Sequence, residues 1–313
     1  MRVLAGDIGG TNTRLALMRA TDGELTIERR QTLASQSLDG LSAAAAAFAE
    51  GAAIEGAAFA VAGPVHEGSA KLTNLRWSVN ATELRSALGV PSEVLNDFAS
   101  VALGVPHVAD QLDPIRPREG SSKSQGVRLF VGAGTGFGVA YAFGDAVHAS
   151  EGGHIGLSPY DDASERAWRY AHERFGRVSV ERLVSGPGLA LIDAALGSNS
   201  RRPATDGAEV TRLAAGGDEV ALQALTTFAE LYGAAAGDLA LALRPDVLYI
   251  AGGIAQKLRP DFDFDAGFLR GLENKGRMKP LVQSFPVYVV TGDEVGLMGA
   301  GAAAVRAASS GRT

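Results

Sequence analysis

Two short segments combine glycine and threonine in a way that suits the binding of phosphate groups. The first is Gly6-Asp7-Ile8-Gly9-Gly10-Thr11-Asn12, and the second is Gly134-Thr135-Gly136. Glycines carry no Cβ, so backbone N–H groups can converge on an anion, and the threonine hydroxyl adds a donor. Asp7 would repel a phosphate unless a cation lay between them, and Mg²⁺ is the usual cation there. The first segment therefore predicts a nucleotide-phosphate site with Mg²⁺, while a glycine hairpin with a solvated Asp7 is the open alternative.

Asn96 and Asp97 form a second candidate group. They follow the apolar stretch Val94-Leu95 and precede a pattern typical of a helix. In open α/β sheets, ligands bind beyond the carboxyl ends of strands, which is where these two residues fall. The alternative interpretation makes one of them the N-cap of the helix that follows. The local sequence leaves both interpretations open.

Three more segments carry polar or glycine residues suited to a small ligand. Glu151 and His154 are separated by two glycines, so their side chains could approach a ligand closely or serve the fold alone. Glu181 lies in a predicted first helical turn, where the helix dipole by itself favours an acid. Gly252 and Gly253 follow an apolar strand and could hold the base or ribose of a nucleotide, or simply begin a helix.

The two Gly/Thr turns lie between apolar strands, in residues 4–17 and 129–141. Two hairpins of one design predict a duplicated fold, with the nucleotide held between the copies. The first half reads as three strands, an Ala-rich helix over residues 38–50 and a strand over 57–61. The second half includes a helix over 220–243, strands over 246–251 and 287–290, and a final small-residue helix. Residues 113–126, rich in Pro, Ser and Gly, predict a loop near the domain boundary. Trp168, Ala171 and Phe175 share a helical face that we expect to be core.

The composition limits the class of protein. The chain has 313 residues, 46% of them hydrophobic and 20% charged, which favours two globular domains. The net charge of −6 argues against nucleic-acid binding, and the absence of cysteine excludes disulfides and Cys-ligated zinc. The N-terminus enters a strand directly, without the regions of a signal peptide, and the apolar runs are too short to cross a membrane. We expect a cytoplasmic protein without a nucleic-acid or membrane partner.

Several familiar catalytic motifs are missing. No Gly-Lys dipeptide occurs, so the chain has no Walker A loop. Neither glycine turn fits the dinucleotide-binding pattern, and Asp97-Phe98-Ala99 is not the Asp-Phe-Gly of protein kinases. The nucleophile elbow of hydrolases and the His-Glu-x-x-His of zinc proteases are also missing.

Seven motifs in order resemble those of the bacterial glucokinases, which belong to the hexokinase, heat-shock-70 and actin superfamily. Besides the two phosphate turns and Asn96-Asp97-Phe98, these are Glu151-Gly152-Gly153-His154, Glu181-Arg182 with Ser185-Gly186-Pro187-Gly188, Ala251-Gly252-Gly253-Ile254 and Gly296-Leu297-Met298-Gly299. The resemblance implies an α/β protein with two ribonuclease-H-like (actin-like ATPase) domains flanking a cleft. We expect a small domain of residues 1–108 plus 296–313 and a large domain of residues 109–295.

The same resemblance implies an activity and a role for each candidate. The chain would phosphorylate the 6-hydroxyl of glucose with ATP and Mg²⁺. Asp97 would accept the hydroxyl proton, and Asn96, Glu151, His154 and Glu181 would bind the sugar. The two turns would hold the phosphates, Gly252 and Gly253 the adenosine, and Asp7 the Mg²⁺ through water. Related repressor-type sugar kinases often carry a Cys-rich zinc motif, and this chain without cysteine departs from them.

Two alternatives to glucokinase activity stay open at this point. One is a kinase for another hexose, such as mannose or an amino sugar, because no residue fixes the preference at the 2-position. The other is a non-catalytic sugar sensor or actin-like assembly protein, which the acidic composition and the intact Asp97 disfavour. Ala-rich helices could line a homodimer interface or fill cores.

Overall fold

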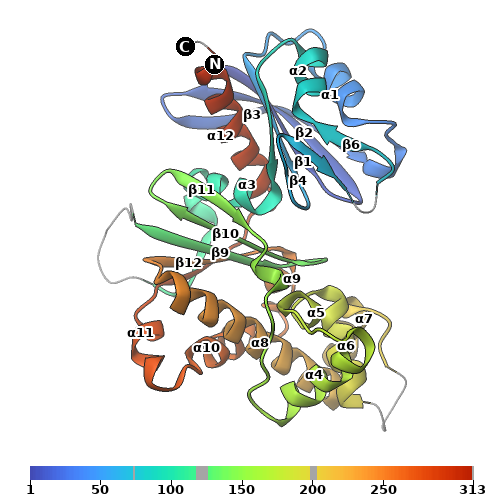
Figure 1. The fold of residues 1–313 in the computed structure, drawn as a ribbon, viewed down its shortest axis with the longest axis vertical. Helices are drawn as coiled ribbons and strands as arrows, with labels where there is room; N and C mark the ends of the chain where they lie inside the picture. The colour runs from blue at the N-terminus through green and yellow to red at the C-terminus, as the bar shows by residue number, and fades with distance from the viewer. Residues whose placement is uncertain (73–74, 118–125, 198–202, 312–313) are drawn as a thin grey trace. The chain divides into compact units, whose positions relative to one another are not determined.

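The computed structural model describes residues 1–72, 75–117, 126–197 and 203–311. The chain divides into two compact units, which are shown in Figure 1. Unit 1 contains Met1–Gln111 and Gly292–Thr313, and unit 2 contains Leu112–Thr291. The domain boundaries expected from the sequence lie close to these limits, and the assignment of each unit as a folding domain stays a prediction.

Unit 1 is built on a five-stranded sheet with the order β3-β2-β1-β4-β7. Its elements are β1 (Arg2–Ile8), β2 (Asn12–Thr21), β3 (Glu24–Ala34), α1 (Leu41–Ala49), β4 (Gly56–Val61), β5 (Ser69–Lys71), β6 (Ser78–Asn80), α2 (Ala81–Leu88), β7 (Ser92–Asn96), α3 (Asp97–Gly104) and α12 (Val295–Ser310). The hairpin β1-β2-β3 is antiparallel, whereas β4 and β7 run parallel to β1. Every residue of β4 is buried, as expected of a central strand covered on both faces.

The last helix of the chain, α12, packs on β1, β4 and α3 of unit 1. Small residues make this approach close. A Cβ on Gly299 would lie 1.7 Å from the backbone oxygen of Ser100, and a Cβ on Gly104 would lie 1.9 Å from that of Val295. The hydroxyl of Ser100 donates to the backbone oxygen of Gly296 at 2.7 Å. The small-residue pattern of the final helix therefore serves a backbone-to-backbone contact with α3.

Unit 2 has a six-stranded sheet with the order β11-β10-β9-β12-β13-β8. Its elements are β8 (Leu112–Arg116), β9 (Val127–Ala133), β10 (Phe137–Phe143), β11 (Ala146–Ser150), α4 (Asp162–Phe175), α5 (Val180–Leu183), α6 (Gly186–Gly197), α7 (Gly207–Ala215), α8 (Glu219–Leu243), β12 (Val247–Ala251), α9 (Gly253–Leu258), α10 (Phe264–Glu273), α11 (Lys279–Gln283) and β13 (Val287–Val290). The long helix α8 packs against α10, where glycines again allow close contact. A Cβ on Gly233 would lie 1.9 Å from the backbone oxygen of Phe268.

The two units share one strand order. In each, an antiparallel three-stranded hairpin is followed by two strands parallel to its first strand, β4 and β7 in unit 1 and β12 and β13 in unit 2. The repeated topology confirms the duplicated α/β fold.

One sequence expectation was wrong: residues 112–116 form β8, an edge strand antiparallel to β13, and are not a loop. Pro114 is tolerated there because an edge strand leaves some N–H positions unpaired. The rest of the predicted loop lies largely outside the described residues.

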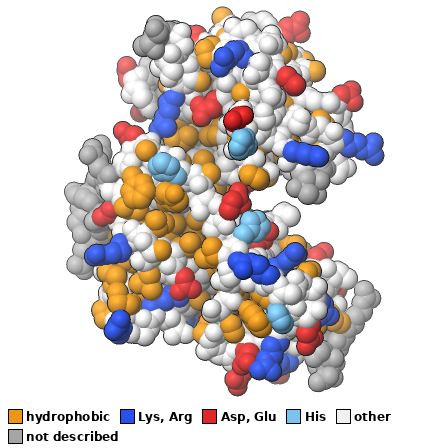
Figure 2. All heavy atoms as spheres, viewed as in Figure 1, with side chains coloured by type: hydrophobic (Ala, Val, Ile, Leu, Met, Phe, Trp, Pro, Cys, Tyr) orange, Lys and Arg blue, Asp and Glu red, His pale blue; other side chains and the backbone are white. Residues whose placement is uncertain are grey.

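Two further features concern the apolar length of the helices and the distribution of surface charge. Within the described residues, no helix is long and apolar enough to cross a membrane. On the face shown in Figure 2, Lys and Arg side chains are interspersed with Asp and Glu and do not gather into a basic patch.

Candidate active site

The first glycine turn joins β1 to β2 in unit 1. The N–H of Gly9 donates to the backbone oxygen of Asn12 at 2.9 Å and closes the turn. Ser35, the first residue of the short 3₁₀ helix Ser35–Ser37, holds the turn from the side. Its N–H donates to the oxygen of Thr11 at 2.9 Å, and its hydroxyl donates to the oxygen of Gly9 at 2.7 Å. Ser35 could not be recognised from the sequence, because serines are common in loops, yet its buried side chain holds the turn.

Asp7 lies on β1 directly before this turn, paired in register with Arg14 of β2. Burial raises the pKa of the Asp7 carboxyl above its ordinary value, and the positive charge of Arg14 opposes the rise. The two charged groups are 3.6 Å apart. The site thus holds a partly desolvated acid beside a phosphate-type turn, which is the arrangement expected if a cation is to join them.

A dedicated protein cage for a metal is not present in the described ranges, since no three His, Cys, Asp or Glu side chains gather there. Mg²⁺ does not require such a cage, because it keeps several waters and binds through one or two carboxylates plus substrate phosphates. The donor set around Asp7 fits that mode of binding.

Asn96 and Asp97 lie where β7 ends and α3 begins. The side-chain oxygen of Asn96 accepts the N–H groups of Phe98 at 2.9 Å and Ala99 at 3.2 Å, and its Nδ2 donates to the oxygen of Gly63 at 3.0 Å. Asn96 is therefore the N-cap of α3, as the alternative interpretation held. Asp97 is the first residue of the helix, half-buried, with Oδ1 accepting the N–H of Phe98 at 2.9 Å. The cap orients both side chains at the carboxyl end of β7, the edge strand of the unit 1 sheet.

The second glycine turn, residues 134–136, joins β9 to β10 in unit 2. Within it, the N–H of Gly134 donates to the oxygen of Gly136 at 2.8 Å. The N–H of Gly186 donates to the oxygen of Gly134 at 2.8 Å, and Glu181 Oε2 accepts the N–H of Phe137 at 2.9 Å. A Cβ on Gly136 would lie 2.4 Å from that Glu181 oxygen, so a larger residue would displace the carboxylate from its present position. Glu181 is thus more than a first-turn acid, because it ties α5 to the turn.

Glu151 is the N-cap and His154 the last residue of the short 3₁₀ helix Gly152–His154, which follows β11. Both side chains are exposed, and His154 Nε2 lies 3.7 Å from Glu151 Oε2. The glycines between them pack onto β10: a Cβ on Gly153 would lie 2.1 Å from the backbone oxygen of Phe137. The segment that carries Glu151 and His154 therefore packs against β10, the strand that begins after the second glycine turn.

Gly252 leaves the end of β12 with φ of +84°, a conformation that favours glycine, and caps α9. A Cβ there would lie 2.6 Å from the oxygen of Ala133, so the chain at Gly252 rests on the backbone just before the second glycine turn. The two nucleotide-type segments predicted in unit 2 are therefore neighbours.

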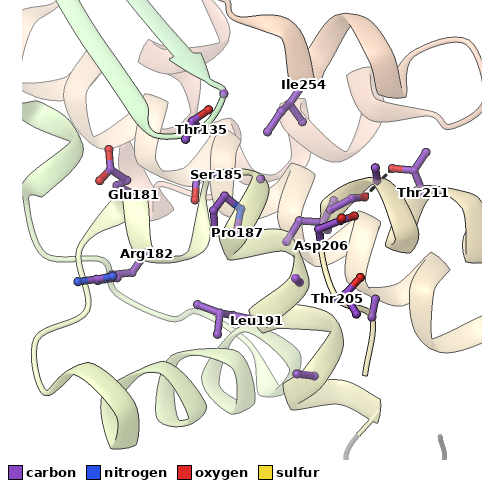
Figure 3. Close-up of a pocket in the computed structure, with 18 of the residues that line it drawn as sticks. Thr135, Glu181, Arg182, Ser185, Pro187, Leu191, Thr205, Asp206, Thr211 and Ile254 are labelled. Carbon is purple, nitrogen blue, oxygen red and sulfur yellow. Dashed lines mark hydrogen bonds between the residues drawn. The ribbon is translucent and has the colours of Figure 1, made fainter. Parts of the chain in front are cut away.

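A pocket of about 950 Å³ in unit 2 collects residues from these segments, and Figure 3 shows Thr135, Pro187 and Ile254 around it. Gly134 and Thr135 line it from the second turn, and Gly253 lines it from α9. Apolar side chains supply much of the remaining wall, among them Leu189, Ala190, Leu191, Ala194, Ile254 and Leu258, and polar groups come from Thr205, Asp206 and Lys257. An apolar pocket with a few polar groups suits a nucleoside.

The structure also corrects one core prediction. Trp168 and Ala171 pack in the core of unit 2, but Phe175 is 41% exposed and lines the pocket. The Arg182 guanidinium lies over its ring, 4.1 Å from the centroid, which explains how a large apolar side chain is kept at the surface. The helical period alone could not show that the C-terminal end of α4 projects past the core.

The family model described as Glucokinase matches residues 4–307. The chain belongs to the glucokinase family.

Individual glucokinases match over nearly their whole length. A glucokinase of Hahella chejuensis is 37% identical, with 95% of each chain covered. The crystal structure of a glucokinase from an Antarctic psychrotroph superposes with a TM-score of 0.85 at 33% identity, over 97% of this chain and 99% of that one. A glucokinase from Streptomyces griseus described as of the ROK family, in complex with glucose and AMPPNP, shares the fold with a TM-score of 0.60 at 21% identity, over 98% and 100%.

These matches confirm the family, the fold class and the activity predicted from the sequence. Glucokinases are hexose kinases, so the chain is a phosphotransferase that phosphorylates glucose. The roles of the individual side chains stay predictions.

Proposed function

We propose that this glucokinase transfers the γ-phosphoryl group of ATP to the 6-hydroxyl of glucose, with Asp97 as the base that accepts the hydroxyl proton. The observation that carries the proposal is the convergence of Gly134 and Thr135 of the second glycine turn with Gly253 at the start of α9 on one pocket in unit 2. These segments are more than a hundred residues apart in the chain, yet both line a cavity large enough for a nucleoside.

Phosphoryl transfer asks the protein chiefly for positioning and for neutralisation of charge. In the proposal, the N–H groups of the two glycine turns bind phosphate oxygens, and the adenosine occupies the pocket of unit 2. Gly252 and Gly253 contact the adenosine, since the pocket wall and the capping position of α9 meet there. The raised pKa of Asp7 supports a role in holding Mg²⁺ through water, because a cation would relieve its desolvation. When bound, Mg²⁺ supplies charge neutralisation for the phosphates.

An alcohol is a weak nucleophile at neutral pH, and a carboxylate within hydrogen-bond reach is the simplest remedy. The position of Asp97 supports this role, because Asn96 caps α3 and fixes the direction of the first helical residue.

Glucose presents several hydroxyls, and the proposal assigns their binding to carboxylate, amide and imidazole groups. These groups are Asn96, Glu151, His154 and Glu181. A site that bonds particular hydroxyls discriminates strongly against sugars that lack them. Since ATP and its hexose acceptor are both cytoplasmic metabolites, the proposal also assigns the reaction to the cytoplasm.

The experiment is glucose-dependent ADP release by wild type, Asp97→Asn and Asp97→Ala. Loss of the base should lower kcat by about 10²- to 10⁴-fold, because general-base catalysis contributes that much. Asp110→Ala is the matched control, since Asp110 is an exposed acid of the same unit. Turnover by Asp97→Asn within threefold of wild type would remove Asp97 from the chemistry. A panel of mannose and amino sugars compared by kcat/KM tests the assignment to glucose.

A further inference from the structure

Tyr232 is a buried residue of α8 that touches the backbone at the base of the nucleotide-type turns. The side chain has no exposed surface. Its hydroxyl accepts the N–H of Ala133 at 3.0 Å and lies 3.4 Å from the backbone oxygens of Val131 and Ala251, to which it can donate. One hydroxyl therefore contacts the ends of both β9 and β12.

The position of this hydroxyl follows from the way the two strands part. The parallel pairing of β9 with β12 ends at Gly132 and Ala251, and the chain then turns away at Gly252. Ala133 lies one residue beyond the end of that ladder. The Tyr232 hydroxyl takes the place of a strand acceptor for the Ala133 N–H, which would be costly to bury unpaired.

The ring of Tyr232 reaches the other side of the second glycine turn. Its centroid lies 5.3 Å from that of Phe137, at an interplanar angle of 75°, and Phe137 is the first residue after the turn. Phe264 and Phe268 of α10 hold the ring from behind, with centroids at 5.7 and 5.4 Å. Tyr232 thus contacts the residues on both sides of residues 134–136, one through its hydroxyl and one through its ring.

A shift at Ala133 would reach both nucleotide segments. Ala133 directly precedes Gly134, and a Cβ added to Gly252 would lie 2.6 Å from the backbone oxygen of Ala133. We propose that Tyr232 is a positioning residue for the nucleotide, because it sets where the turn at residues 134–136 and the turn at residues 252–253 face the pocket. This inference rests on the proposed function, in which those turns bind ATP.

The test is the variant Tyr232→Phe, which keeps the ring and removes the hydroxyl. The dissociation constant of ADP is measured by calorimetry on the full chain without sugar, together with KM for ATP, KM for glucose and the urea midpoint. We expect the dissociation constant and KM for ATP to rise about tenfold, as for one lost buried hydrogen bond. KM for glucose should stay within twofold.

Tyr160→Phe is the matched control. Tyr160 is a half-buried tyrosine of unit 2, but its hydroxyl donates to Glu230 at 3.0 Å and not to either turn. It should lower stability without changing ADP binding. Phe137→Leu is the second variant, because it removes the ring contact and keeps the hydroxyl bond. It should weaken ADP binding about threefold.

ADP binding by Tyr232→Phe within twofold of wild type would overturn the inference, as would equal weakening in Tyr160→Phe. If Tyr232→Phe does not fold, unchanged ADP binding by Phe137→Leu overturns it instead. A wild type that binds no ADP overturns both this inference and the proposed function. A wild type that binds ADP but transfers no phosphoryl group to sugar contradicts the proposed function alone. In that case, comparing the ADP affinities of Tyr232→Phe and Tyr160→Phe still tests the inference about Tyr232.

Discussion

Asn96 offers a way to separate stability from sugar binding at a single position. Its amide oxygen accepts two N–H groups at the start of α3, and its Nδ2 donates to Gly63 on the segment after β4. Asn96→Ala removes all three hydrogen bonds. Loss of an N-cap costs about 1 kcal/mol, and loss of a further hydrogen bond costs about 1 kcal/mol more. We therefore expect the free energy of unfolding of unit 1 to fall by about 2 kcal/mol.

Asn96→Asp and Asn96→Ser complete the series. Both side chains can cap α3, and a carboxylate is favoured at a helix N-terminus, so most of the capping contribution should return. Neither can reproduce the amide donor: serine is too short to span both contacts, and aspartate presents an oxygen to the oxygen of Gly63. In the proposed function all three variants lose the amide that binds sugar, so KM for glucose should rise in each.

The assays are urea unfolding followed by circular dichroism, and initial rates at varied glucose with saturating ATP. If Asn96→Ala kept its urea midpoint, the cap would not hold the start of α3. If Asn96→Asp kept the wild-type KM for glucose, the amide would have no part in sugar binding, and Asn96 would be a capping residue only.

Two further predictions concern unit 1. Because burial raises the pKa of Asp7, its ionised form opposes folding at neutral pH, so Asp7→Asn should raise the thermal midpoint at pH 7. That gain in thermal midpoint should vanish as the pH falls toward about 4, where the wild-type acid is protonated. Loss of the Mg²⁺ contact in the same variant should lower kcat/KM about 10- to 100-fold. A thermal midpoint of Asp7→Asn below that of wild type at pH 7 would contradict the reasoning. Gly299→Ala should destabilise by about 3 kcal/mol, since its Cβ would meet the backbone of α3, whereas Gly40→Ala, with no atom within 4 Å, should change little. Equal urea midpoints for these two variants would show that α12 can move away from α3.

The sequence was a good guide to the strands and long helices. Strong alternation and apolar runs marked both hairpins, and the helix expected over residues 220–243 is α8, Glu219–Leu243. The strand at residues 112–116 was missed because Pro114 lies within it, and Pro117 and a run of polar residues follow it, a composition typical of a loop. Its pairing with β13 depends on a contact more than a hundred residues away, which local composition cannot encode.

Local motifs point to candidate site residues, but they do not reveal the tertiary support of the site. The glycine turns and Asn96-Asp97 are candidates from their local pattern, and their roles stay predictions. Ser35 and Tyr232, which hold the two turns, lie in ordinary surroundings: a Ser-Gln-Ser stretch and an Ala-rich helix. Their importance arises only when distant strands end beside them. Glu181 also shows a function that the pattern did not reveal, since its carboxylate accepts a backbone N–H of the next strand.

The return of α12 to unit 1 has a consequence for synthesis on the ribosome. Unit 2 is one continuous segment, Leu112–Thr291, whereas unit 1 needs the last helix to cover β1 and β4. The first strands to emerge therefore keep an apolar sheet face uncovered until α12, residues 295–310, leaves the exit tunnel. The part of the chain made second can complete its core before the part made first, which reverses the usual N-to-C order of folding during translation.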